Sequence, residues 1–263
     1  MLNNNFSIGI VGLGTVGTAT IKLLEKEIES INNKSGKNII IKAISSKNHS
    51  KKRDIDLTRY EWENNPEQLS IREDIDAVVE LIGGSDGIAK NLAYSAIKNE
   101  KHFITANKAL IAKHGYDLHK SILGTNISIY YEAAVAGAIP IINSIKNGLI
   151  SNNILGIEAI LNGTCNYIMS DMTNNETSFK ESLKKAQELG FAEADPSFDI
   201  EGIDSAHKLV ILGMLAYGAK PDLDKIYIEG ITSITPEDIK YATRLGFAIK
   251  LFCIAKQEKN KLD

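Results

Sequence analysis

The sequence predicts an α/β protein in which a doubly wound parallel sheet is followed by a second domain of the α+β type. Over the first half, short runs that are apolar at every position alternate with helical patterns, which is typical of parallel strands covered on both faces. After Glu132, strand and helix patterns no longer alternate one for one. We therefore expect domains at residues 1–131 and 132–263.

The first domain is expected to consist of strands joined by right-handed crossover helices. The strand patterns cover residues 6–11, 39–45, 77–82, 102–105 and 127–131. Helical patterns run from the first strand to Ile31, cover 88–98 and begin again near Ala109. The polar, basic stretch 47–54 is expected to be a loop or the start of a helix.

The second domain is expected to mix strands and helices without a regular order. The predicted strands are 154–161, 227–231 and 247–255, and the predicted helices are 179–189, 200–217 and 236–245. The small apolar stretch 133–150 is expected to open a helix, although Gly137 and Pro140 interrupt it. The polar segment 257–263 follows the last strand directly and is expected to complete no part of the fold.

Composition and charge exclude several classes of protein. The 263 residues include 30 Lys and Arg against 33 Asp and Glu, a net charge of −3, which argues against a nucleic-acid binder that works by neutralising phosphates. No apolar run reaches the roughly 18–20 residues of a membrane span, and the N-terminus lacks a signal-peptide pattern. Cys165 and Cys253 are too few for a disulfide framework. We expect a cytoplasmic protein without nucleic-acid or membrane partners.

The first strand leads into a glycine-rich turn that is typical of dinucleotide-binding proteins. The turn is Gly12-Leu13-Gly14-Thr15-Val16-Gly17, and a helix follows it. In such a turn the first glycine permits the bend, the second lets a pyrophosphate approach and the third lets helix pack on strand. The helix N-terminus then favours the phosphates. The alternative is an ordinary glycine-rich turn without a ligand.

The end of the second strand bears on which dinucleotide is bound. An acidic residue there would accept from the ribose 2′-hydroxyl of NAD. This chain instead has Ser45-Ser46-Lys47, with Lys51, Lys52 and Arg53 close behind. The absence of a carboxylate and the nearby cations favour NADP, with NAD as a possible second cofactor. The alternative is a solvated basic loop.

Two lysines stand where chemistry is expected. Lys108 follows Thr105-Ala106-Asn107 at the carboxyl end of a predicted parallel strand, where ligands of such sheets bind, although a solvated lysine at a helix start is an equal alternative. Lys208 lies four residues after Asp204, on one face of a helix that continues into an apolar core. A lysine beside carboxylates can transfer a proton, whereas a capping and salt-bridge cluster is the structural alternative.

Around these residues the sequence resembles the homoserine dehydrogenases. Residues 186–208 are similar to the signature of that family, in which Ala, Gly, Asp-Pro, Asp, Gly, Asp and Lys occur at these spacings. Five earlier segments also resemble the family, and they occur in the family's order along the chain: 12–17, 80–84, 105–110, 132–140 and 162–167. The resemblance covers nearly the whole chain.

The resemblance implies an oxidoreductase that reversibly reduces L-aspartate 4-semialdehyde to L-homoserine with NAD(P)H, in threonine, methionine and isoleucine biosynthesis. It implies that Lys208 donates the proton and that Lys108 is a second catalytic lysine. Glu193, Asp199 and Asp204 correspond to the positions that bind the substrate.

The resemblance also implies a cofactor, an ion and a second copy of the chain. Cofactor contacts are implied for the glycine turn and for Thr105, Asn107, Lys108 and Gly190. A sodium ion is implied at Glu132 and at the main-chain carbonyls of Val135, Gly137 and Ile139, which are hard oxygen ligands. Family members pair through the second domain, so we expect a homodimer or a larger assembly.

The chain departs from the family pattern in two places. The stretch Ser45-Ser46-Lys47 lacks the Arg-Asp pair often found there. Family members usually continue beyond the strand at 247–255, and many add an ACT regulatory domain, so we expect a partial second domain. One alternative is a truncated or split-subunit homologue that is inactive alone. Another is a different semialdehyde or amino-acid dehydrogenase that shares the glycine turn.

Overall fold

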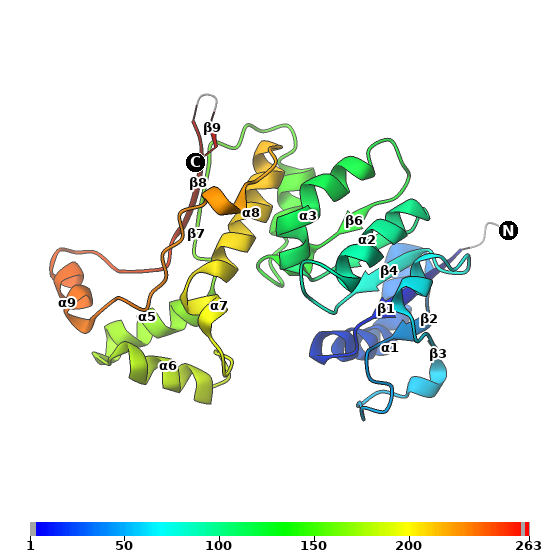
Figure 1. Cartoon of the computed structure of the whole chain (residues 1–263), viewed down its shortest axis with the longest axis horizontal. Helices are drawn as coiled ribbons and strands as arrows, with labels where there is room; N and C mark the ends of the chain where they lie inside the picture. The colour runs from blue at the N-terminus through cyan, green and yellow to red at the C-terminus, as the bar shows by residue number, and fades with distance from the viewer. Residues whose placement is uncertain (1–3, 259–260, 263) are drawn as a thin grey trace. The chain divides into compact units, whose positions relative to one another are not determined.

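The computed structural model describes residues 4–258 and 261–262, and the chain divides into two compact units after Pro140 (Figure 1). The boundary expected from the sequence lay earlier, after Tyr131. Tyr131 is fully buried in the first unit, and its hydroxyl lies 2.6 Å from Nε2 of His119. The short turn η3 (Glu132–Ala134) contacts the sheet of the same unit. The segment that follows Tyr131 therefore stays with the first unit as far as Pro140.

The first unit contains the predicted doubly wound parallel sheet. Its strands lie in the order β3-β2-β1-β4-β5-β6, and neighbouring strands pair in parallel. The strands are β1 (Asn5–Val11), β2 (Asn38–Ser45), β3 (Glu61–Trp62), β4 (Ala77–Glu80), β5 (His102–Thr105) and β6 (Ile129–Tyr130). The edge strand β3 was not predicted, because two residues are too short to show a periodic pattern.

Helices cover both faces of this sheet. The helices are α1 (Thr15–Ser35), α2 (Ile88–Lys98) and α3 (Lys108–Ser121), with short 3-10 turns η1 (Leu57–Arg59) and η2 (Pro66–Ser70). Helix α1 lies on one face, and α2 and α3 lie on the other (Figure 1). Because β1 lies between β2 and β4, the chain reverses direction across the sheet at this point. The carboxyl ends of β1 and β4 therefore border the crevice where such folds bind ligands.

The second unit has a small antiparallel sheet and a group of helices. Strands β7 (Gly156–Ala159), β8 (Cys253–Glu258) and β9 (Lys261–Leu262) lie in that order. The helical segments are α4 (Ile141–Asn143), the π turn η4 (Ser144–Gly148), α5 (Gly163–Asn175), α6 (Phe179–Glu188), α7 (Ser197–Ile200), α8 (Ile203–Tyr217), η5 (Leu223–Lys225) and α9 (Pro236–Arg244). This is the expected α+β character.

The predicted strand at 227–231 is wrong. Within the described residues the segment pairs with no strand; instead the N–H of Ile231 donates to the carbonyl of Ile200 at 2.8 Å. The backbones approach so closely that a Cβ on Gly230 would lie 2.4 Å from the same carbonyl oxygen. The apolar run is therefore used to close the end of a helix rather than to extend a sheet.

Local backbone geometry changes two of the predicted helical segments. The stretch 133–150, expected to open a helix with interruptions at Gly137 and Pro140, forms the short elements η3, α4 and η4, and Ala136 and Ala138 have positive φ angles of 48° and 70°. The helix predicted at 200–217 is present as α8, but it begins only at Ile203, after Gly202 with a φ of 86°. These conformations are local and leave no trace in the apolar periodicity.

The C-terminal strand is displaced relative to its prediction. Extended pairing begins at Cys253 rather than at Phe247 and continues through Gln257, which is paired with Leu262 of β9. The polar segment was expected to complete no part of the fold, but its first residues extend β8 and its later residues form β9. Residues 259, 260 and 263 of that prediction lie outside the described residues.

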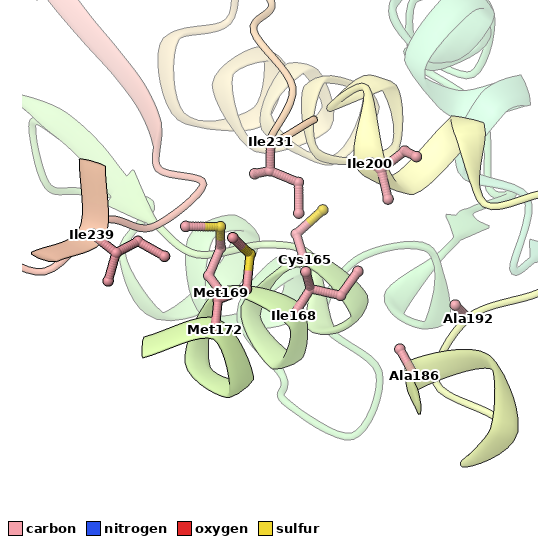
Figure 2. Close-up of a cluster of buried hydrophobic side chains, with 9 residues drawn as sticks. All are labelled: Cys165, Ile168, Met169, Met172, Ala186, Ala192, Ile200, Ile231 and Ile239. Carbon is pink, nitrogen blue, oxygen red and sulfur yellow. The ribbon is translucent and has the colours of Figure 1, made fainter. Parts of the chain in front are cut away.

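The core of the second unit is formed by side chains from several short elements. Figure 2 shows α5 contributing four of them, which face residues from α6, α7, α9 and the segment before α9. The nine buried residues are Cys165, Ile168, Met169, Met172, Ala186, Ala192, Ile200, Ile231 and Ile239. This core fixes α5, which Asn162 caps, and α7, which carries Asp199.

Candidate active site

The glycine turn has the geometry that its three glycines predicted. Gly12 has a φ of +98°, and a Cβ there would lie 2.5 Å from the carbonyl oxygen of Leu81. A Cβ on Gly17 would lie 1.8 Å from the carbonyl oxygen of Gly12, so only glycine allows α1 to pack this closely. A Cβ on Gly14 would meet nothing within 4 Å. Gly12 and Gly17 thus serve the fold, whereas the space beside Gly14 is open to a ligand.

A hollow of about 320 Å³ lies beside this turn. Its lining combines the start of α1 with the basic loop after β2: Leu13, Gly14, Thr15, Thr18, Ala19, Lys22, Lys51, Lys52, Arg53 and Asp54. Val16, also predicted as a cofactor contact, is 55% exposed on the first turn of α1. The helix N-terminus and the lysines together favour an anionic ligand in this hollow.

Arg53 ties the basic loop to the glycine turn. Its Nε donates to the carbonyl oxygen of Leu13 at 3.0 Å, and Nη1 and Nη2 donate to the carbonyls of Lys51 and Asn48, each at 2.8 Å. Nη2 also lies 3.1 Å from Oγ of Ser46. The guanidinium thus organises the loop, and this role was not visible in the sequence. Lys51 remains exposed on the same loop.

The predicted residues after β5 form a hydrogen-bonded network with the end of β4. The fully buried Glu80 accepts from the Thr105 hydroxyl at 2.6 Å and from two main-chain N–H groups of the loop after β4. Asn107 caps α3 and donates to the carbonyl of Gly84 at 2.6 Å. Lys108, the first residue of α3, is held at this edge of the sheet. Sequence reasoning missed Glu80 as the centre of the network.

The loop that carries the expected sodium residues has a strained backbone. Ala136 and Ala138 flank Gly137 with positive φ angles, a conformation that costs of order 1 kcal/mol for a residue other than glycine. A turn from the N–H of Ile139 to the carbonyl of Ala136, at 2.8 Å, holds the loop. Val135 is fully buried, and Glu132 opens η3. The donor set of one carboxylate and three carbonyls suits a hard cation.

In the second unit, Lys208 and Asp204 form an ion pair on α8. Nζ of Lys208 lies 2.7 Å from Oδ2 of Asp204 and donates to the carbonyl oxygen of Leu161, also at 2.7 Å. The Asp204 side chain is 4% exposed and the Lys208 side chain 18%, so the lysine can still be reached from solvent. The helix then enters the core at Val210. The predicted pairing is therefore present, and its partial burial sets it apart from a surface ion pair.

Asp199 joins this pair through Asn162. The side-chain amide of Asn162 donates to Oδ1 of Asp199 at 2.7 Å and to Oδ2 of Asp204 at 2.9 Å. The Thr164 hydroxyl lies 2.6 Å from the carbonyl oxygen of Phe191 and 3.2 Å from Oδ2 of Asp199. The segment before α5 thus brings together carboxylates from two places in the chain. The sequence had marked residues 162–167 only as a family-like segment, so these contacts were not predicted.

The remaining predicted residues lie on the loop between α6 and α7. Gly190 has a φ of 77° and ends α6, and Phe191 after it stacks on Tyr167 at 4.8 Å between ring centroids. Glu193 is exposed, while its carbonyl accepts from Gln187 at 3.1 Å. Glu193 therefore lies on a short loop that leads to Asp199 and is held by the hydrogen bond from Gln187.

The two cysteines are unsuited to covalent chemistry. Burial raises the pKa of the Cys165 thiol to about 12, and burial also raises the pKa of Cys253. Both thiols are therefore protonated at neutral pH. Across the described ranges 4–258 and 261–262, no group of three His, Cys, Asp or Glu residues could hold a metal ion. No helix in that part of the chain is long and apolar enough to cross a membrane.

These features define a dinucleotide-binding α/β protein whose second unit carries a partly buried lysine–carboxylate cluster. Lys108 and Lys208 belong to different units, each with its own set of contacts. The glycine turn, the hollow beside it and the network at the end of β4 are all parts of the first unit. Asp199, Asp204 and Lys208 are brought together within the second.

Comparison with known proteins assigns both units to one family. The homoserine dehydrogenase NAD-binding domain matches residues 12–132, and the homoserine dehydrogenase domain matches residues 140–262. A homoserine dehydrogenase of Helicobacter pylori is 44% identical over 262 residues, covering 100% of this chain and 61% of the relative. One from Bacillus subtilis is 38% identical, covering 97% of this chain and 59% of the relative.

Solved structures agree. A homoserine dehydrogenase from Thiobacillus denitrificans superposes with a TM-score of 0.91 at 41% identity, covering 98% of this chain and 59% of that one. A protein from Archaeoglobus fulgidus assigned to the homoserine dehydrogenases has a TM-score of 0.85 at 32% identity, and this chain covers 82% of it. The chain belongs to the homoserine dehydrogenase family. It spans about three fifths of the length of the curated relatives it matches.

Proposed function

We propose that this chain performs the reversible reduction of L-aspartate 4-semialdehyde to L-homoserine with a nicotinamide dinucleotide. The observation that supports it most is the pair of Lys208 and Asp204, which is 2.7 Å apart, partly buried and joined to Asp199 through one amide. A partly buried lysine of this kind is suited to proton transfer. The similarity to proteins named homoserine dehydrogenase gives the substrate class.

The residues of the second unit would handle the substrate and the proton. A nicotinamide dinucleotide bound at the glycine turn would supply the hydride for the aldehyde carbon. Lys208 then gives its proton to the aldehyde oxygen during reduction and takes it back during oxidation. Asp204, 2.7 Å from Nζ, orients the lysine. Asp199 and Glu193 bind the ammonium group of the amino acid, and Lys108 is the second catalytic lysine.

The cofactor proposed is NADP, with NAD as an alternative. The exposed Lys51 and Lys52 line the hollow beside Gly14, and no carboxylate follows β2 directly, so a ribose 2′-phosphate would be attracted rather than repelled. Steady-state kinetics with both cofactors test this. We expect a lower KM for NADP⁺ than for NAD⁺, and the reverse order would overturn the preference.

A sodium site and a homodimer complete the proposal. Glu132 and the carbonyls of Val135, Gly137 and Ile139 would hold the ion, and the strained alanines of this loop support that fit. Thermal unfolding in sodium against potassium chloride tests the site, with a higher Tm expected in sodium. Sedimentation equilibrium tests the dimer, which a monomer at micromolar concentration would exclude.

The reaction itself is tested by following reduced nicotinamide when the purified chain is mixed with L-homoserine and NADP⁺. Turnover that depends on homoserine, and not on related hydroxy amino acids, is the expected result. Turnover of another semialdehyde or amino acid in its place would favour a different dehydrogenase of the same fold.

The alternative is a homologue that is inactive alone and needs a separate polypeptide. It predicts cofactor binding without turnover by this chain alone. Activity would then appear when a separate polypeptide equivalent to the rest of a relative is added. Turnover by this chain alone would exclude the split-subunit reading.

A further inference from the structure

We propose that Asn162 is a positioning residue that holds Asp204 and, through it, Lys208 in the geometry needed for proton transfer. This inference rests on the proposed function. Asn162 lies immediately before α5, and only 4% of its surface is exposed. No role was expected for it from the sequence beyond membership of a family-like segment.

The side-chain amide of Asn162 uses both its nitrogen and its oxygen in hydrogen bonds. Nδ2 donates to Asp199 at 2.7 Å and to Asp204 at 2.9 Å, while Oδ1 accepts from the N–H of Cys165 at 2.8 Å. The two N–H groups therefore serve two different carboxylates, and the oxygen fixes the amide to the start of α5. The amide cannot turn without losing the helix cap.

The same peptide segment also holds the lysine. Leu161, the residue before Asn162, accepts from Nζ of Lys208 at 2.7 Å. Each member of the ion pair on α8 is thus hydrogen-bonded to one of two consecutive residues, Leu161 and Asn162, which lie directly before α5. A shift of this segment would move the lysine and its counter-ion together, so the orientation of Nζ depends on it.

The choice of asparagine has a chemical reason. Asp199 and Asp204 are like charges, and each accepts one N–H from the same neutral group. A serine or threonine hydroxyl has a single proton to donate, and an aspartate has none when ionised. Of the short side chains that cap helices well, asparagine alone offers two donors and an acceptor. This set of contacts exceeds what capping α5 would need.

Two variants separate positioning from capping. Asn162→Ser and Asn162→Asp both keep an oxygen that can cap α5, but Asn162→Ser loses one donor and Asn162→Asp loses both and adds a negative charge. Ser178→Ala is the matched control, because Ser178 caps α6 in the same unit through a capping box and touches none of these carboxylates.

The first measurement is the steady-state oxidation of L-homoserine. We expect kcat to fall at least about tenfold in both Asn162 variants, with an unchanged KM for the dinucleotide and unchanged kinetics in Ser178→Ala. The pH–rate profile of Asn162→Asp should move to higher pH, since the added negative charge favours protonated neighbours. A kcat within twofold of the active wild type in both variants would overturn the proposal.

The second measurement does not depend on activity. In protein labelled with ¹⁵N-lysine, the ammonium signal of Lys208 is identified by its absence from Lys208→Met. We expect this signal to shift or broaden in both Asn162 variants and to stay in place in Ser178→Ala. An unchanged signal in the Asn162 variants would refute the positioning role, whether or not the wild type oxidises homoserine. Failure of the wild type to oxidise homoserine would count against the proposed function alone.

Discussion

The glycine turn of the first unit and the lysine–carboxylate cluster of the second are built on opposite principles. The turn is made of backbone: its glycines are required because a Cβ would lie 2.5 Å or less from a carbonyl oxygen at Gly12 and Gly17. The cluster is made of side chains, and its members come from segments near residues 162, 199 and 208. A backbone site is compact in sequence, whereas a side-chain site depends on packing between distant segments.

The largest expected effect is in the second region. Lys208→Ala should lower kcat by about 10²–10⁴-fold with cofactor binding largely retained, because the proposed proton donor is lost. It also removes the cation paired with the buried Asp204 carboxylate, so the free energy of unfolding should fall by about 3–5 kcal/mol.

The matched control is Lys185→Ala. Lys185 pairs with the buried Asp171 at 2.5 Å but contributes nothing to the cluster around Lys208. Steady-state kinetics and circular dichroism on both variants make the comparison. A kcat for Lys208→Ala within a few-fold of the control would refute the assignment of Lys208.

In the first region, two glycines separate folding from ligand binding. Gly17→Ala places a Cβ 1.8 Å from a carbonyl oxygen and should destabilise the chain by about 1–3 kcal/mol or more. Gly14→Ala meets nothing within 4 Å and should leave the unfolding midpoint in urea unchanged. Its Kd for the dinucleotide should nevertheless rise about tenfold, since the pyrophosphate needs that space.

Urea titration and calorimetric binding on both glycine variants provide the measurement. Wild-type affinity in Gly14→Ala would show that the ligand does not approach this turn.

A smaller effect is expected for the cofactor preference. Lys51→Glu with Lys52→Glu reverses two exposed charges that line the hollow, so the KM for NADP⁺ should rise about tenfold while the KM for NAD⁺ changes little. Lys180→Glu, an exposed charge reversal on α6, is the control. An equal change for both cofactors would place the 2′-phosphate elsewhere.

The smallest effect concerns acid stability in the second unit. The hydrogen bond and charge of Lys185 lower the pKa of Asp171 from 3.8 to about 2. A depressed pKa stabilises the fold above pH 4, and this contribution is lost as the pH falls from about 4 to 2.

Asp171→Asn should therefore unfold more easily at neutral pH, by about 1 kcal/mol, and lose part of its acid sensitivity. Urea unfolding at pH 7 and near pH 3 measures this. If the free energies of unfolding of wild type and variant differed by the same amount at both pH values, the role of the Asp171 carboxylate would be contradicted.

Much of the first unit could be predicted from the sequence. Continuous apolar runs give the buried parallel strands, and the spacing of Gly12, Gly14 and Gly17 gives the turn, because both are local features of the chain. The hydrogen-bonding role of Arg53 was missed, since its acceptors are main-chain carbonyls that carry no sequence signal.

The second unit could be predicted only in part. The spacing of Asp204 and Lys208 within a helix gave their pairing. The path of residues 227–231 was wrong, because the run closes a helix end against Ile200 rather than joining a ladder. The start of α8 at Ile203, after the left-handed Gly202, was placed three residues too early, since one left-handed residue does not change the apolar period.

The sequence by itself determined the parallel sheet, the glycine turn, the lysine–aspartate pair and the resemblance to one family. Each of these depends on residues close together in the chain, whose geometry is set by helix and strand periods. The tertiary structure decided that Asn162 bridges Asp199 and Asp204, that Glu80 centres the network after β4, and that residues up to Pro140 stay with the first unit. Those contacts join residues far apart in sequence, and only packing brings them within hydrogen-bonding distance.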